Sequence, residues 1–392
     1  MISLDKYRKY SLTPLLLISY AACRYSAGAS DVTSWATWSK RFHNLGFKEG
    51  YLLNLAPYPP GSTLINSFFI YSTNMDPKLI LDCILAVVVT IFMYVAWKEA
   101  ATSILPAFLL IYIPTVIGGW IDIYFALPLL LSLKYIETER YLAAGICFQI
   151  SILMKYQPLL FLPFILLFIL LKARISGVLY FCSPAILVWP IVAFIFGPST
   201  WIETLKLAVL KANLSGQALN IGWILTYLQH RGIDVGAYPR ESVISMRPIY
   251  LDVHGHPYLF MKIVLYAVLL LLTLRFLMRT KKEFSDLMVL LISVGLAYYL
   301  CSPGVHLNHI MLIAAPTVLL SRRKELSWFS LLSLFMVADL PVLIFYGLNG
   351  VTSLDPLIGQ VRFSVIATPF VMSAIIYLLL AFNRNVSRNR LT

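Results

Sequence analysis

A single carboxylate opens the most polar stretch near the N-terminus. Asp31 follows an apolar segment, and Trp35 and Trp38 come four and seven residues later. This spacing places the three side chains on one side of a short helix lying along a membrane surface. A carboxylate at the rim of a partly dry cavity is suited to act as a general base on an acceptor hydroxyl. The alternative is that Ser30 or Asp31 caps the helix and that the tryptophans form an aromatic belt.

Two turns supply further polar residues. Tyr58-Pro-Pro-Gly61 forms a rigid corner, which is structural in itself and can also provide one wall of a site. Gly118-Gly-Trp-Ile-Asp122 reads as a tight turn with an acidic residue at the start of the next helix. Helix capping explains Asp122, and a second active-site carboxylate or a metal ligand is the alternative.

Basic and histidine side chains occur at two other connections. Lys155-Tyr-Gln157-Pro lies between two apolar helices, where an amine either snorkels to the interface or binds the phosphate of an anionic lipid. His306 and His309 are three residues apart and share a face if they are helical. They suit hydrogen bonding to a phosphate or a sugar, or else one is a structural histidine at a helix N-terminus. A zinc site needs more ligands than this segment offers. We expect no cofactor, and a divalent metal is an alternative that the sequence does not support.

These residues are set in a chain dominated by membrane-like sequence. Of its 392 residues, 59% are hydrophobic and only 12% are charged, which is far from the composition of soluble domains. Long apolar runs recur throughout, so we predict an all-α polytopic membrane protein that forms a single domain over residues 1–392. About twelve spans are expected, at roughly 11–28, 79–97, 103–118, 122–135, 141–156, 158–171, 175–196, 258–278, 284–301, 308–320, 327–347 and 364–382.

The distribution of Lys and Arg predicts the orientation. Most of the 31 basic residues fall in short connections on one side if both termini are cytoplasmic, so the net charge of +13 is a topology signal rather than a sign of nucleic-acid binding. The opposite, outer side then carries two large loops, 29–78 and 197–257. Asp31, Asp122, Lys155 and the histidine pair all map to that outer side, which predicts an outward-facing site opening onto lipid.

The order of these features resembles the GT-C superfamily of polytopic glycosyltransferases that use polyprenyl-phosphate sugars. The first span, Asp31 at its exit, the aromatic loop and the Tyr-Pro-Pro turn carry the resemblance. The segments Trp120-Ile-Asp122, Ala143-Ala-Gly145 and Lys155-Tyr-Gln-Pro-Leu-Leu160 resemble its bacterial mannosyltransferase-like branch. Val305-His-Leu-Asn-His309 is similar to a His-Glu motif of relatives, with Leu307 in place of the Glu.

The resemblance implies an inverting transferase in the plasma membrane, or in the ER membrane of a eukaryote. Asp31 would be the general base, and Lys155 with His306 or His309 would hold the phosphate of the polyprenyl-linked donor. The sugar or the glycan or glycolipid acceptor would contact Asp122, Tyr58, Gln157 and Arg247, under a cover formed by the loop 197–257.

Two other classes share lipid-linked substrates. A transporter or flippase would place charges near the bilayer midplane and show a two-fold repeat. Only Asp339 lies well inside a predicted span, and no repeat is evident. An O-antigen ligase or polymerase would instead be centred on arginines such as Arg240 and Arg247.

Overall fold

The computed structural model describes most of the chain after the first predicted span. The described residues are 31–54, 58–73, 77–99, 104–209, 218–229, 256–279, 282–321, 327–346, 357–358 and 361–388. The predicted span 11–28 and both loop arginines, Arg240 and Arg247, lie outside them. Asp31 is described as the first residue of a helix, but its side chain lies outside the described part.

The described part is almost wholly helical, as the apolar runs predicted. A pair of two-residue strands, β1 (Leu357–Ile358) and β2 (Val361–Arg362), forms a small antiparallel ladder. The helices are α2 (Asp31–Asn54), α3 (Pro60–Thr73), α4 (Pro77–Glu99), α5 (Leu105–Gly118), α6 (Ile123–Glu137), α7 (Tyr141–Met154), η1 (Gln157–Phe161), α8 (Leu162–Phe196), α9 (Pro198–Val209), α10 (Ile221–Gln229), α12 (His256–Leu277), α13 (Phe284–Cys301), η3 (Leu307–Ile313), α14 (Ala314–Ser321), α15 (Trp328–Tyr346) and α16 (Phe363–Arg388).

Several of these helices are long and apolar enough to cross a membrane. Five stretches of the described residues qualify by length and composition, namely Leu79–Glu99, Gln157–Phe196, His256–Leu277, Phe284–Cys301 and Ile366–Asn383. Shorter apolar helices accompany them at Tyr141–Met154, Leu307–Ser321 and Trp328–Ile344. These helices agree with an all-α, membrane-embedded protein, and the number of twelve spans stays a prediction.

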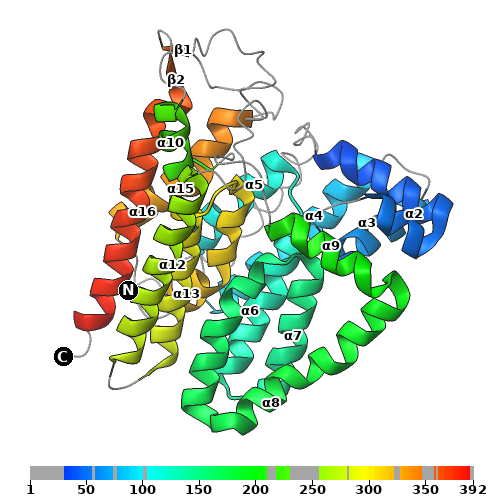
Figure 1. Cartoon of the computed structure of the whole chain (residues 1–392), viewed down its shortest axis with the longest axis horizontal. Coiled ribbons are helices and arrows are strands. Elements are labelled where there is room, and N and C mark those ends of the chain that lie inside the picture. Colours follow the sequence, from blue (N-terminus) through cyan, green and yellow to red (C-terminus); the bar gives the residue numbers. More distant parts are fainter. Residues whose placement is uncertain are drawn as a thin grey trace, which may run out of the picture.

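The two spans predicted at 158–171 and 175–196 are joined in α8. The backbone leaves the helical region inside it at Arg174, where φ is 59°. Figure 1 shows the sharp bend of this helix, shown in green. The predicted boundary between the two spans therefore coincides with a break rather than with a separate loop.

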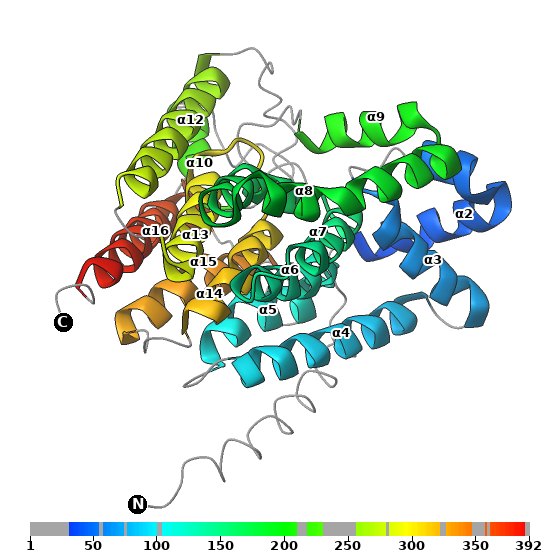
Figure 2. The same ribbon diagram turned by 90° about the horizontal axis from the view of Figure 1, so that it is seen from below.

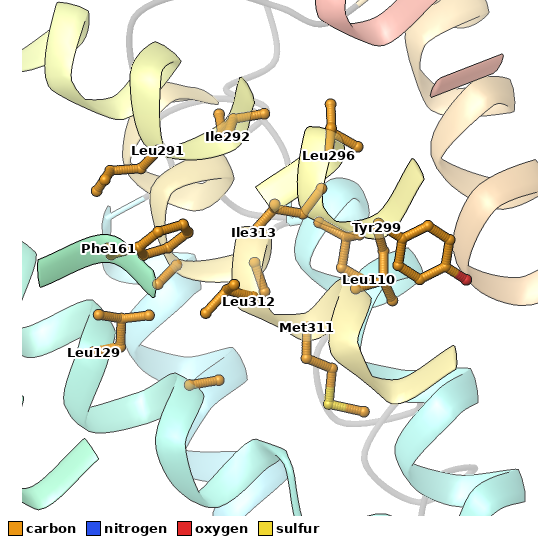
Figure 3. Close-up of a cluster of buried hydrophobic side chains, with 14 of the residues drawn as sticks. Leu110, Leu129, Phe161, Leu291, Ile292, Leu296, Tyr299, Met311, Leu312 and Ile313 are labelled. Carbon is orange, nitrogen blue, oxygen red and sulfur yellow. The ribbon is translucent and has the colours of Figure 1, made fainter. Parts of the chain in front are cut away.

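The core is centred on α13. Its Leu291, Ile292, Leu296 and Tyr299 are buried and meet side chains from four other helices (Figure 3). These partners are Leu110 of α5, Leu129 of α6, Phe161 of η1 and Met311, Leu312 and Ile313 of η3.

Apolar side chains also cover the outside of the bundle. Ile186 and Phe194 of α8 are 72% and 90% exposed, and Leu271 of α12 and Phe370 of α16 are more than half exposed. Such surfaces are costly in water and favourable against lipid tails.

The helices α2, α3 and α9 gather at one end of the molecule, beside the ends of α7 and α8 (Figures 1 and 2). The helices α12, α13, α15 and α16 form the other side. Near the C-terminal ends of α4 and α6, Lys134 pairs with Glu99.

Candidate functional site

The Tyr58–Gly61 corner packs tightly against the end of α7. A Cβ atom on Gly61 would lie 2.5 Å from the Leu153 carbonyl oxygen and 3.1 Å from the Met154 Cε atom. A side chain cannot fit at that distance, so glycine allows α3 to start here. Before it, the Tyr51 hydroxyl donates to the Tyr58 carbonyl oxygen at 2.7 Å. Burial raises the pKa of Tyr51 far above its ordinary value, which keeps this donor protonated.

Aromatic rings join this corner to the first helix. The ring centroids of Trp35 and Trp38 are 4.9 Å apart, and Tyr58 lies 5.0 Å from Trp35 and 5.8 Å from Trp38. Asp31 begins α2 one turn before Trp35. The predicted aromatic face of this helix therefore faces the corner.

The glycine turn after α5 places Asp122 at the start of α6. Gly119 ends α5 in the left-handed conformation, with φ of 63°, and its N–H donates to the Thr115 carbonyl oxygen. A Cβ atom on Gly118 would lie 2.5 Å from the buried Trp120 ring. Both glycines are thus required by the turn that the sequence predicted.

Asp122 forms a buried ion pair instead of capping α6. Its Oδ1 atom lies 2.5 Å from the Lys155 Nζ atom, and its Oδ2 atom accepts a hydrogen bond of 2.8 Å from Asn308 Nδ2. It makes no capping hydrogen bond to the helix. The Asp122 and Lys155 side chains are only 1% and 4% exposed. The contacts of Asp122, Lys155 and Asn308 thus link three segments of the chain, which lie before α6, after α7 and before α14.

Lys155 also faces the aromatic corner. It is an extended residue between α7 and η1, and its backbone N–H donates to the Ser151 carbonyl oxygen. Its Nζ atom lies 5.2 Å from the centre of the Tyr58 ring, a distance typical of cation–π contacts. The ammonium group is thus held between a carboxylate and an aromatic face.

The two histidines lie at the start of η3. In a 3₁₀ helix, residues three apart are eclipsed, and the His306 and His309 rings accordingly meet edge-to-face at 5.7 Å. His309 is buried, and its Nε2 atom lies 3.0 Å from Gln157 Nε2, while His306 is exposed. One ring therefore belongs to the interior of the site and the other to its surface.

Two acceptor oxygens in this region are buried without a hydrogen-bond donor among the described residues. They are Oε1 of Gln157 and Oδ1 of Asn308. The Asn308 orientation follows from its bond to Asp122, because a carboxylate only accepts and the amide nitrogen must face it. Buried acceptors of this kind are normally satisfied by a ligand or by water.

Two points of the loop 197–257 contact the same region. In α9, the Thr204 hydroxyl lies 3.1 Å from the Tyr51 hydroxyl and 2.9 Å from that of Tyr156. Farther on, Asn220 Nδ2 donates to the carbonyl oxygens of Tyr299 and Ser302, in the segment that leads to the histidines.

The structure thus brings together most of the residues predicted from sequence. We refer to the following residues as the polar cluster: Tyr58, Asp122, Lys155, Gln157, His306, Asn308 and His309. Asn308 was not predicted, although its place between two histidines marks it. Neither Arg247 nor the Asp31 side chain is described. Among the described residues, no group of three or more His, Cys, Asp or Glu side chains is arranged to hold a metal ion.

A scan against models of protein families and a search of curated proteins found no match for this chain.

Proposed function

We propose that this protein is an inverting glycosyltransferase. It moves one sugar from a polyprenyl-phosphate donor to a cell-surface glycan or glycolipid on the outer face of the membrane. The observation that supports this most is the polar cluster. Segments far apart in the sequence bring a cation, two histidines and two unmatched acceptor oxygens to one place, beside the helix that Asp31 begins.

The donor phosphate is assigned to Lys155 and to His306 or His309. His306 is exposed and so accessible to a phosphate arriving from the membrane surface. Lys155 is buried and oriented by Asp122 and Tyr58, so its charge is held at a fixed place inside the cluster. Hydrogen bonds from cations to phosphate oxygens are about twice as strong as neutral ones, which suits a leaving group that gains charge.

The sugar is assigned to the carboxamide side of the cluster. Hydroxyl groups donate hydrogen bonds, and Gln157 Oε1 and Asn308 Oδ1 are buried acceptors without a donor in the described structure. The Tyr58 ring, which faces Lys155, provides an apolar wall of the cluster. A site built in this way rejects a ligand that lacks the hydroxyls, since the acceptors would stay unpaired.

The reaction needs one base. The acceptor hydroxyl oxygen attacks the anomeric carbon from the face opposite the phosphate, and its proton passes to the Asp31 carboxylate. The bond from the anomeric carbon to the phosphate oxygen breaks, and polyprenyl phosphate leaves with the electron pair. One displacement of this kind inverts the configuration at the anomeric carbon.

One observation favours a transporter instead. Asp339 in α15 is fully buried, and neither of its carboxyl oxygens has a hydrogen-bond partner among the described residues. Ionisable groups inside apolar helices often mark transport pathways. Product formation in detergent separates the two functions, because no transbilayer movement takes place there.

The decisive experiment replaces the base. With purified protein in detergent and a panel of polyprenyl-phosphate sugars, Asp31→Asn should lower the rate of transfer by about 10²–10⁴-fold, the usual contribution of a general base. Asp339→Asn is the matched control and should keep the rate of the unchanged protein. Full activity of Asp31→Asn, with its thermal unfolding unchanged, would contradict the assignment.

A further inference from the structure

A cavity of about 440 Å³ lies between α2 and α3. This volume is within the range of sites that bind small molecules, which is about 300–1,000 Å³. Gly46 lines it at the point where α2 kinks with φ of 78°. The other lining residues are Ser39, Phe42 and His43 of α2 and Leu64, Ser67 and Phe68 of α3.

The cavity is apolar with a few polar atoms. Ser67 is only 7% exposed, and its hydroxyl has no hydrogen-bond partner among the described residues. On the facing helix, Ser39 donates its proton to the Trp35 carbonyl oxygen at 2.8 Å, which leaves its oxygen able to accept. An apolar space with one unmatched buried hydroxyl suits the chain of an amphipathic molecule that carries a polar group near its head.

The exposed surface of α2 is mostly basic. Lys40, Arg41, His43 and Lys48 are exposed on it together with the acid Glu49, and His43 also lines the cavity. The partner helix α3 contains no charged residue. The charge that complements this surface is negative, because Lys and Arg near a membrane surface favour anionic lipid.

The cavity lies one helical turn from the polar cluster. Ser39 follows Trp35 by four residues, and the Trp35 ring contacts Tyr58, which contacts Lys155. Asp31 precedes Ser39 by eight residues, which is about 12 Å along a helix. A lipid with its chain in the cavity can therefore extend its headgroup to the start of α2.

We propose that the cavity between α2 and α3 is the acceptor subsite and that the acceptor is an anionic lipid. Its aliphatic chain lies between Phe42, Leu64 and Phe68, and its glycerol or ester region meets Ser67. Its phosphate lies at Lys40 and His43, and the rest of its headgroup, with the acceptor hydroxyl, extends along α2 to Asp31. The role as acceptor subsite rests on the proposed glycosyltransferase function. The binding of the lipid does not.

Binding is measured by native mass spectrometry of the purified full chain in detergent. Phosphatidylglycerol is the probe, and phosphatidylcholine with the same chains is the comparison. The unchanged protein should prefer phosphatidylglycerol. Ser67→Phe fills the cavity and should weaken binding of phosphatidylglycerol by about tenfold or more. The same substitution at Ser373, an exposed residue of α16, should leave it unchanged.

A charge variant covers the case in which Ser67→Phe does not fold. Lys40→Glu changes an exposed side chain and should weaken phosphatidylglycerol binding by about fivefold or more, with phosphatidylcholine unaffected. Lys172→Glu, at an exposed residue of α8, is its control. Equal binding of both lipids, or unchanged binding by Lys40→Glu, would overturn the proposal. So would a polyprenyl phosphate that displaces phosphatidylglycerol from the cavity, because the donor would then occupy it.

The experiments distinguish a failure of the glycosyltransferase proposal from a failure of the lipid-binding proposal. Asp31→Asn should bind phosphatidylglycerol normally while its rate of sugar transfer falls by about 10²–10⁴-fold. If transfer persists in Asp31→Asn and lipid binding still depends on Ser67, the enzymatic assignment is wrong and the lipid site stands. If transfer depends on Asp31 and lipid binding is unselective, the acceptor is a different molecule.

Discussion

At the scale of residues, the buried contact of Asp122 with Lys155 and Asn308 is costly to break once it has formed. A buried ion pair is tolerated in the folded protein only while both charges are present. If one partner is removed, the remaining charge is desolvated without compensation. Its stabilising value relative to an apolar pair is small, whereas the cost of breaking it is large. The pair therefore positions the site more than it stabilises the fold.

We predict that Asp122→Asn and Lys155→Met each lower the free energy of unfolding by about 3–5 kcal/mol. The double variant leaves no unpaired charge and should recover part of this loss. Chemical unfolding in detergent measures all three variants as a double-mutant cycle. A loss in the double variant equal to the sum of the single losses would show that the pair is not formed.

At the scale of elements, the corner between α2 and α3 depends on one glycine. The contact of Gly61 with the Leu153 carbonyl oxygen is with backbone, which cannot move aside as a flexible side chain does. Any Cβ atom here displaces α3 from α7 and moves Tyr58 away from Lys155.

Gly61→Ala should therefore lower the free energy of unfolding by about 1–3 kcal/mol and also slow sugar transfer. The midpoint of thermal unfolding and the initial rate, measured on the same preparation, test both effects. Ser373→Ala is the control, because Ser373 is exposed and its hydroxyl donates to the Pro369 carbonyl oxygen of its own helix. An unchanged unfolding midpoint in Gly61→Ala would mean that the two helices are farther apart than described.

Sequence reasoning reached the local parts of the site and missed its long-range pairings. The turns at Tyr58–Gly61 and Gly118–Asp122 could be predicted because Pro and Gly restrict or free the backbone locally. Lys155 and the histidines stood out because polar groups are rare beside apolar runs. The bond from Asn308 to Asp122 spans 186 residues and depends on how the helices pack, which no local pattern encodes.

Among larger features, too, those that depend on local sequence could be predicted, and those that depend on helix packing could not. Many of the described helices lie on the predicted apolar runs, and the break of α8 fell at the predicted boundary near Arg174. The cavity between α2 and α3 was not predicted, since it results from the kink at Gly46 and from the approach of two helices.

At the scale of the whole molecule, the orientation in the membrane can be measured directly. In a cysteine-free background, His306→Cys should react with a membrane-impermeant maleimide from the outside of intact cells. Lys172→Cys should react only after the membrane is opened. Both side chains are exposed, so access to the reagent decides the result. The reverse pattern would place the polar cluster in the cytoplasm and contradict the predicted topology.

The ion pair of Asp122 also bears on biosynthesis. Asp122 and Lys155 are 33 residues apart, at the same end of the α6–α7 hairpin, so they can pair as soon as that hairpin enters the membrane. Asn308 is synthesised much later, on the order of ten seconds or more at the usual rate of translation. During that interval the carboxylate lacks one of its two donors. Arrival of the late helices then completes the shell around Asp122, so the site matures only when the C-terminal half has inserted.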